Sequence, residues 1–251
     1  MKKVILSYLP ESILEKDKRN VFLTFIFIAM IMLIVEYFGW QGPFSKIGKN
    51  FSFVRTDIKS FTFYAQVYTS LSFMIFFFIF PLVFNFFFPV NADKGTGLGG
   101  FETKTSLKIY LPIVIIMLPV IWIATSSPGF YRFYPLYRPE SLKMFFVYEL
   151  IYATQFIGIE YFFRGFGLFR LEKIMPGYAI AIMVIPYSFV HIHKPFPEAV
   201  GSVIAGIILG HLALKTRSVW PGVFTHIAIA LSADTFSLIH SGTMSKLISF
   251  N

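Results

Sequence analysis

The chain has no cysteine and few charged residues, and each scarcity excludes a class of protein. Without cysteine there is no disulfide, no thiolate nucleophile and no cysteine-ligated metal. Charged residues make up only 14% of the 251 residues, whereas hydrophobic residues make up 56%. A soluble domain of this length would carry a more charged exterior. The composition therefore predicts an all-α, polytopic transmembrane helical bundle embedded in a lipid bilayer.

The few charges are also unbalanced, with 22 Lys and Arg against 13 Asp and Glu. Basic residues gather in short segments between apolar runs, which is typical of loops that Lys and Arg retain on the cytoplasmic side. We expect an integral protein of the inner or plasma membrane with a cytoplasmic N-terminus, although the loop at 39–60 is as basic as the N-terminus. Little soluble surface is left for a basic face, so no nucleic-acid partner is expected.

Long apolar runs divide the chain into about seven predicted membrane spans, within a range of six to eight. A helix needs about 20 residues to cross the hydrocarbon core. The runs lie at residues 21–38, 61–90, 107–124, 141–163, 178–191, 198–214 and 219–240. No internal repeat or soluble domain is visible, so residues 1–251 form one domain, with a cytoplasmic lead-in at 1–20 and a motif-bearing core at 141–240. On the sixth run, Ser202, Gly206 and Gly210 recur every four residues, which predicts close approach by another helix.

A glycine-rich loop, Lys94–Gly100, separates the second run from the third. Its composition is superficially that of a phosphate-binding loop. It lacks the Gly-Lys-Ser/Thr ending and a flanking strand, and no acidic residue stands at nucleotide-binding spacing. We interpret it as a connecting loop.

Glu160 and Arg164 are four residues apart inside an apolar run, so a helix places both side chains on one face. A charged side chain at the bilayer centre costs at least ~2.5 to 3.5 kcal/mol, so such residues usually face an interior and carry function. A packing ion pair that fixes helix register is the alternative interpretation of these two residues alone.

All five histidines follow Glu160 in the sequence: His191, His193, His211, His226 and His240. His191 and His193 are two apart, so at most one of them faces a shared centre on a helix. His211 and His240 lie near span ends and are interpreted as interfacial. Glu160, Arg164, His191 and His226 can converge on one embedded pocket, where a carboxylate and two imidazoles bind or activate water.

These residues occur in the order of motifs that is found in the CPBP family of intramembrane proteases, which includes type II CAAX prenyl endopeptidases and bacterial Abi proteins. The chain resembles this family over roughly residues 145–235. Glu160-Tyr-Phe-Phe-Arg164 is similar to the second Glu and the Arg of a Glu-Glu-x-x-x-Arg motif. Tyr187-Ser-Phe-Val-His191 is similar to Phe-x-x-x-His, and Phe189 with His193 matches it literally. We favour His191 because Lys194-Pro195 follows shortly after it, and His226 stands in the last motif, His-x-x-x-Asn.

Two positions depart from the pattern. Ile159 stands where the family has its first Glu, and Ala230 stands where the last motif has Asn. Asp234, two helical turns after His226, is a candidate replacement for the missing polar group.

The resemblance implies an intramembrane endopeptidase that cleaves a membrane-associated or prenylated-type peptide or protein. Glu160 would act as general base and Arg164 would hold its charge and geometry. His191 and His226 would stabilise the oxyanion or bind a divalent metal such as zinc, with a metal-free, glutamate-activated water as the alternative. Ile159 and Ala230 motivate a second hypothesis, a catalytically impaired member that acts as a membrane scaffold or immunity-type partner. A transporter is less favoured, because the polar residues occupy only one half of the chain.

Overall fold

The computed structural model describes residues 15–52, 54, 57–90, 95–99 and 103–249. Most of the predicted lead-in, residues 1–14, and the two ends of the glycine-rich loop, Lys94 and Gly100, lie outside this range. The described part is helical and contains no strand, which confirms the predicted all-α helical bundle.

Six helical rods in the described residues are long and apolar enough to cross a membrane. Three of them contain a π-helical turn. The first rod is α2 (Lys16–Ile34), which ends in the π-helical turn Val35–Gly39. The second is α4 (Ile58–Met74), followed by the π-helical turn Ile75–Ile79 and α5 (Phe80–Phe87), and the third is α8 (Leu142–Glu160), followed by the π-helical turn η5 (Tyr161–Leu168) and α9 (Phe169–Glu172). The other three are α6 (Thr103–Thr125), α11 (Phe196–Thr216) and α12 (Trp220–His240). Short helices α3 (Gln41–Ile47), α7 (Pro128–Tyr131) and α13 (Thr243–Ser249) lie between or after them.

The fifth predicted span, residues 178–191, is wrong in length. Helix α10 (Ala179–Phe189) has only 11 residues, which is about 16 Å at 1.5 Å per residue and half of the hydrocarbon thickness. The chain turns at residues 190–195, and α11 begins at Phe196, directly after Pro195. This early turn carries His191 into the bundle, and the six long helices remain within the predicted range.

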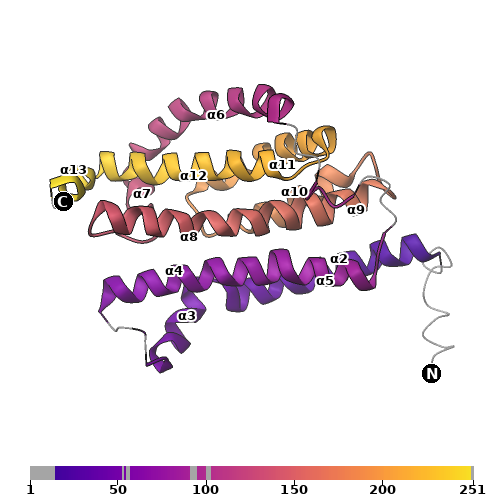
Figure 1. Ribbon diagram of the computed structural model, residues 1–251, viewed down its shortest axis with the longest axis horizontal. Helices are drawn as coiled ribbons and strands as arrows, with labels where there is room; N and C mark the ends of the chain where they lie inside the picture. Colours follow the sequence, from indigo (N-terminus) through magenta and orange to yellow (C-terminus); the bar gives the residue numbers. More distant parts are fainter. Residues whose placement is uncertain (1–14, 53, 55–56, 91–94, 100–102, 250–251) are drawn as a thin grey trace.

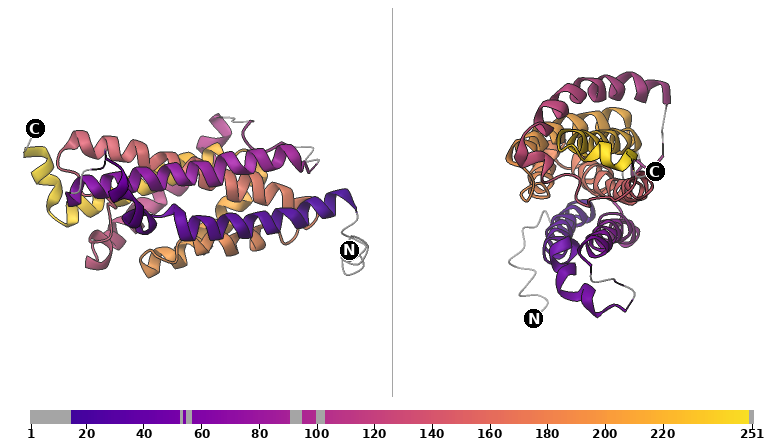
Figure 2. Two further views of the ribbon diagram at one scale, coloured as in Figure 1. Left: turned by 90° about the horizontal axis from the view of Figure 1, so that it is seen from below. Right: turned by 90° about the vertical axis from the view of Figure 1, so that its left-hand side faces the viewer.

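The helices run along the long axis of the molecule in two groups (Figure 1). In the end-on view of Figure 2, α2 to α5 form one group and α6 to α13 the other. Helix α8 joins the two groups, because it packs against both α4 and α12. Helix α6 lies at the outer edge and packs mainly on α12.

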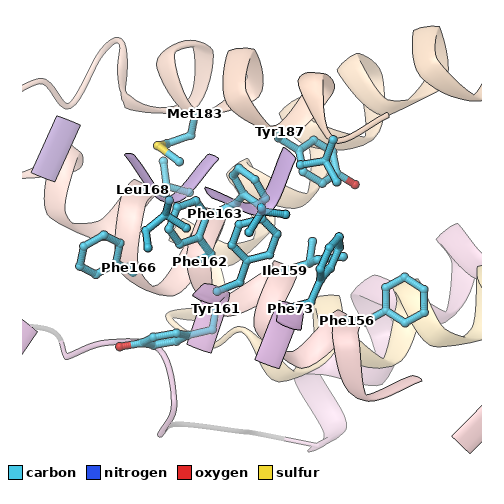
Figure 3. Packing of buried hydrophobic residues seen from close by; sticks show 14 of the residues in the cluster. Phe73, Phe156, Ile159, Tyr161, Phe162, Phe163, Phe166, Leu168, Met183 and Tyr187 are labelled. Carbon is cyan, nitrogen blue, oxygen red and sulfur yellow. The ribbon is translucent and has the colours of Figure 1, made fainter. Parts of the chain in front are cut away.

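An aromatic core surrounds the junction of α8 and η5 (Figure 3). Phe73 and Phe77 of the α4 rod meet Phe162 and Phe163 of η5, with the Phe77 and Phe162 ring centroids 4.7 Å apart. Gly158 permits this contact, since a Cβ there would lie 2.7 Å from the Phe73 carbonyl oxygen. Close approach of two backbones at a glycine is common in membrane helices.

The small residues of α11 behave as their spacing predicts. A Cβ on Gly206 would lie 3.0 Å from Tyr187 and Val184, and one on Gly210 would lie 3.3 Å from Ile180. All three neighbours belong to α10. The predicted close approach by another helix is thus confirmed, with α10 as the partner.

Gly158→Ala is expected to lower the thermal unfolding midpoint by several degrees, because the new methyl group pushes the α4 and α8 backbones apart. The matched control is Gly201→Ala, also within a helix, where a Cβ meets nothing within 4 Å. Thermal unfolding of both purified variants in one detergent tests this. Equal midpoints for the two variants would contradict the close packing.

Candidate functional site

Glu160 is the last residue of α8, directly before the π-helical turn η5. Its side chain is only 1% exposed. Glycines Gly165 and Gly167 and three Phe rings shape this turn. Because π-helical turns within α-helices frequently mark functional sites, the irregularity agrees with the position of the charged pair.

Arg164 neutralises the Glu160 carboxylate. Its Nη1 donates to Glu160 Oε1 at 3.1 Å, and its side chain is 3% exposed. The guanidinium also lies 4.0 Å from the ring centroid of Tyr187 on α10. The predicted one-face arrangement of Glu160 and Arg164 is therefore present, and Arg164 links η5 to α10.

His226 of α12 reaches the same carboxylate. Its Nδ1 lies 3.0 Å from Glu160 Oε1, and its ring stacks at 4.4 Å on Phe156 of α8. An ionised carboxylate can only accept a hydrogen bond, so Nδ1 carries a proton, and in the neutral imidazole Nε2 keeps a lone pair. Glu160 thereby sets the orientation and tautomer of the imidazole.

His191 lies in the turn after α10 and is 5% exposed. Its Nδ1 donates to the Tyr187 carbonyl oxygen at 3.1 Å. A carbonyl oxygen has no proton to give, so Nδ1 carries a proton, and in the neutral imidazole the Nε2 of His191 keeps its lone pair. The two imidazoles are therefore prepared in the same tautomer by different acceptors.

Two cavities meet at these histidines. The α4-side cavity, about 400 Å³, extends toward Trp40, Thr69 and Phe73. The α6-side cavity, about 250 Å³, extends between α6, α11 and α12. The residues that line both are Tyr152, Phe156, His191, Lys194 and His226. His191 and His226 thus line the same two cavities, whereas the sequence suggested one pocket shared with Glu160 and Arg164.

Glu160 itself is not among the described residues that line either cavity. One oxygen is engaged by Arg164 and His226. The other is covered by Gly222, where a Cβ would lie 2.7 Å from Glu160 Oε2. The carboxylate therefore stands behind the His226 ring, and His226 is the group that faces the open space.

The two departures from the family pattern lie at the cavity walls. Ile159 lines the α4-side cavity and Ala230 lines the α6-side cavity. Asp234, the candidate replacement, is not placed to substitute: it is 0% exposed, accepts from the Tyr148 hydroxyl at 2.8 Å, and lines neither cavity.

The remaining histidines lie elsewhere. His193 is half-exposed, contacts Glu36 Oε1 through its Nε2 at 2.9 Å, and lines only the α4-side cavity. His240 contacts the Thr125 hydroxyl at 3.1 Å at the end of α12. His211 is exposed on α11.

Sequence reasoning missed a polar cluster of Tyr134, Lys194 and Glu198. The Tyr134 hydroxyl lies 2.8 Å from both Glu198 carboxylate oxygens, and Lys194 Nζ donates to Glu198 Oε1 at 2.8 Å. Burial and the nearby carboxylate raise the pKa of Tyr134 well above its ordinary value, so the hydroxyl stays protonated and donates. Lys194 and Glu198 are four residues apart in the sequence, and this spacing was the feature that could have predicted their contact.

A metal site would need more ligands than the two imidazoles. A catalytic zinc is usually held by three protein ligands. In the part of the chain that the structure describes, no group of three His, Cys, Asp or Glu side chains is placed to hold a metal ion. The donor set does not fit a catalytic zinc, so we assign no chemical step to a metal, and metal binding through His191 and His226 stays a prediction.

The fold and the site define an integral membrane helical protein with a buried ionic centre beside two internal cavities. Residues 141–232, which contain that centre, match the model of the Rce1-like family, described as type II CAAX prenyl endopeptidase Rce1-like. The match confirms the predicted resemblance to CPBP intramembrane proteases over this part of the chain. Searches of curated proteins and of solved structures gave no match.

Arg164→Met alone is expected to lower the stability by about 3 to 5 kcal/mol, because it leaves the Glu160 charge buried without its partner. Adding Glu160→Gln should restore much of the loss, so a double-mutant cycle in detergent yields a large coupling energy.

The matched control is the cycle for Lys59 and Glu140, an ion pair whose side chains are 62% and 59% exposed. Exposed pairs contribute ~0 to 1 kcal/mol. If the buried pair gave no more coupling than this, Arg164 would not be neutralising Glu160.

Proposed function

We propose that the protein is an intramembrane endopeptidase in which His226, held by Glu160, takes the proton from the attacking water. The observation that carries this is the 3.0 Å contact of His226 Nδ1 with Glu160, while the rest of the imidazole lines both cavities. The sequence alone favoured Glu160 as general base. The geometry favours His226 at the reacting water and Glu160 as its positioning residue.

The proposed reaction begins with a water in the shared part of the two cavities. His226 Nε2 accepts a proton from this water, while the oxygen of the water bonds to the carbonyl carbon of the substrate. Glu160 stays ionised and stabilises the imidazolium that forms, as the carboxylate does in hydrolytic triads. The imidazolium then gives its proton to the leaving amine, and the carbon–nitrogen bond breaks.

Two further groups complete the proposal. His191, with its Nε2 lone pair free, accepts a hydrogen bond from the second O–H of the attacking water and fixes the position of the oxygen, which keeps this hydrogen. Lys194 lines both cavities and gives one of its three N–H groups to Glu198, so the others can stabilise the oxyanion. Arg164 serves the site indirectly, because it keeps the charge and position of Glu160.

The family match supports a peptide or protein substrate at the membrane, and a membrane-associated or prenylated-type substrate is the finer proposal. Six apolar helices and the match support an integral membrane location. Insertion in an inner or plasma membrane with a cytoplasmic N-terminus is part of the proposal.

Glu160→Gln is expected to reduce peptide cleavage by the purified protein on the order of 10³- to 10⁴-fold, because an amide favours the wrong tautomer of His226. A peptide-library assay, read by mass spectrometry, measures the rate. The control is Glu140→Gln, at a surface carboxylate that is 59% exposed, for which we expect full activity. Unchanged cleavage by folded Glu160→Gln protein would overturn the proposal.

His191→Ala should abolish cleavage, whereas His193→Ala should retain most of it. The reason is the position of each ring. His191 is buried and lines both cavities, whereas His193 is half-exposed and contacts Glu36. Single-turnover rates of the two variants settle which histidine acts. A loss confined to His193→Ala would contradict the assignment.

A chelator added to the wild-type protein forms a second arm of that experiment. Undiminished cleavage is the expected result for the metal-free reaction. If the chelator abolished cleavage and added zinc restored it, the result would favour a metal held by His191 and His226.

A second function is favoured by Ile159 and Ala230, which present apolar walls where the family motifs have Glu and Asn. A catalytically impaired member could act as a membrane scaffold or immunity-type partner. In that case Glu160→Gln and His226→Ala would leave partner co-purification and the cellular phenotype unchanged, which separates this function from proteolysis.

A further inference from the structure

A second buried cation, Arg170, lies outside the candidate site. It stands in α9, at the end of the long α8 rod, and is 3% exposed. Its side chain reaches α2 and the end of α5 rather than α12. The proposed proteolysis gives this residue no role.

All the hydrogen-bond partners of Arg170 are neutral oxygens. Nε donates to Thr24 Oγ1 at 2.9 Å and Nη1 to Asn85 Oδ1 at 2.6 Å. Nη2 donates to the carbonyl oxygens of Phe88 at 2.8 Å and Asn20 at 3.5 Å. A guanidinium has five N–H groups, so one on Nη1 remains. Among the described residues, no carboxylate forms an ion pair with Arg170.

A cavity of about 210 Å³ lies beside this guanidinium. Its polar lining comes from Asn85, Thr96, Tyr161 and Arg170, and the described residues that line it include no acid. The volume is enough for several water molecules, which occupy about 30 Å³ each in the liquid. The cavity therefore offers one positive charge and hydrogen-bond donors to a small anion.

Tyr161 gives an independent indication of a missing partner. It is 0% exposed, and its hydroxyl has no hydrogen-bond partner in the structure. Figure 3 shows this hydroxyl directed away from Ile159 and Phe73. A buried tyrosine hydroxyl usually finds a partner, and leaving it without one costs roughly 1 to 3 kcal/mol. An anion in the cavity would accept from it.

The neighbouring loop closes over the same cavity. Gly95 and Thr96 line it, and a Cβ on Gly165 would lie 2.6 Å from the Thr96 carbonyl oxygen. The segment is anchored further along, where Val219 N donates to the Gly97 carbonyl oxygen at 2.9 Å. Residues 95–97 of the glycine-rich loop are thus packed beside η5 and form one wall of a buried polar chamber.

The location favours a lipid headgroup as the source of the anion. Arg170 is three residues before Lys173, at the end of a membrane-crossing rod, where headgroups lie. Basic pockets between helix ends commonly hold anionic lipid headgroups. The two charged and two ester oxygens of a lipid phosphodiester form a tetrahedron, so the group can accept from Arg170, Tyr161 and Thr96 on different sides, whereas a carboxylate has two oxygens in one plane.

We propose that the chamber formed by Arg170, Tyr161, Asn85 and Thr96 binds the phosphate of an anionic phospholipid headgroup. Binding would neutralise the buried guanidinium and satisfy the Tyr161 hydroxyl. The bound lipid would also link α5, η5 and α9, whose residues line the chamber, at one end of the bundle. The proposal is independent of catalysis, because the chamber shares no lining residue with the two cavities of the candidate site.

Native mass spectrometry of the full-length protein, titrated with dioctanoyl phosphatidylglycerol, tests this directly. Tyr161→Phe removes only the unpartnered hydroxyl, so the variant should fold normally and bind about tenfold more weakly, as expected for one hydrogen bond to a charged group. The control is Tyr37→Phe, at a tyrosine that is 69% exposed, which should bind like the wild type. Phosphatidylcholine should bind much more weakly than phosphatidylglycerol.

Inorganic phosphate forms the second arm. If millimolar phosphate displaces the lipid only weakly, the headgroup assignment stands. If phosphate alone binds in a Tyr161-dependent manner and phosphatidylglycerol does not, the lipid source is overturned. Equal lipid affinity in wild type and Tyr161→Phe overturns the site itself and leaves Arg170 as a link between helices.

Discussion

The buried ion pair of Glu160 and Arg164 is the constraint on which the rest of the site depends. Both side chains are almost fully enclosed, so neither charge is compensated by bulk water. The pair forms where α8 changes into a π-helical turn, and the turn places Arg164 over Tyr187 of α10. Through Glu160 the same pair also reaches His226 of α12. Three separate helical segments are therefore joined at one carboxylate.

In this arrangement the carboxylate and the imidazoles have different tasks. The carboxylate lies behind, covered by Gly222, while the imidazoles of His191 and His226 face the cavities. Each imidazole donates its Nδ1 proton to a fixed acceptor, Glu160 or the Tyr187 carbonyl oxygen. In the neutral imidazoles both Nε2 atoms then keep a lone pair, and both residues line the space where a substrate can bind. A charge buried at such cost thereby serves to orient a neutral base.

Much of the fold could be predicted because membrane spans are set by length and hydropathy. The apolar runs gave six of the long helices closely, and the small-residue spacing on α11 identified a tight helix contact. The short α10 could not be predicted this way, because residues 178–191 are mostly apolar, and this hydropathy suggested a span although the segment has only 14 residues. The turn before Pro195 depends on tertiary packing, which hydropathy does not report.

The site was predictable only in part for a similar reason. Motif order selected Glu160, Arg164, His191 and His226. Helix geometry predicts that Glu160 and Arg164 lie on one face. Which of the four faces open space depends on Gly222 and on the walls of two cavities, and neither is visible in a linear pattern. Asp234 has suitable helical spacing from His226, yet Tyr148 holds it elsewhere. The spacing of Lys194 and Glu198 is visible in the sequence, but their link to Tyr134, 64 residues before Glu198, could be found only in three dimensions.

The most direct test of the account is the tautomer of His226, which ¹⁵N NMR of histidine-labelled protein in detergent can report for all five histidines. The account predicts a neutral His226 with its proton on Nδ1 and a free Nε2, and a change of this signal in Glu160→Gln. A His226 that carries its proton on Nε2 in the wild type, with a signal that Glu160→Gln does not alter, would contradict the account.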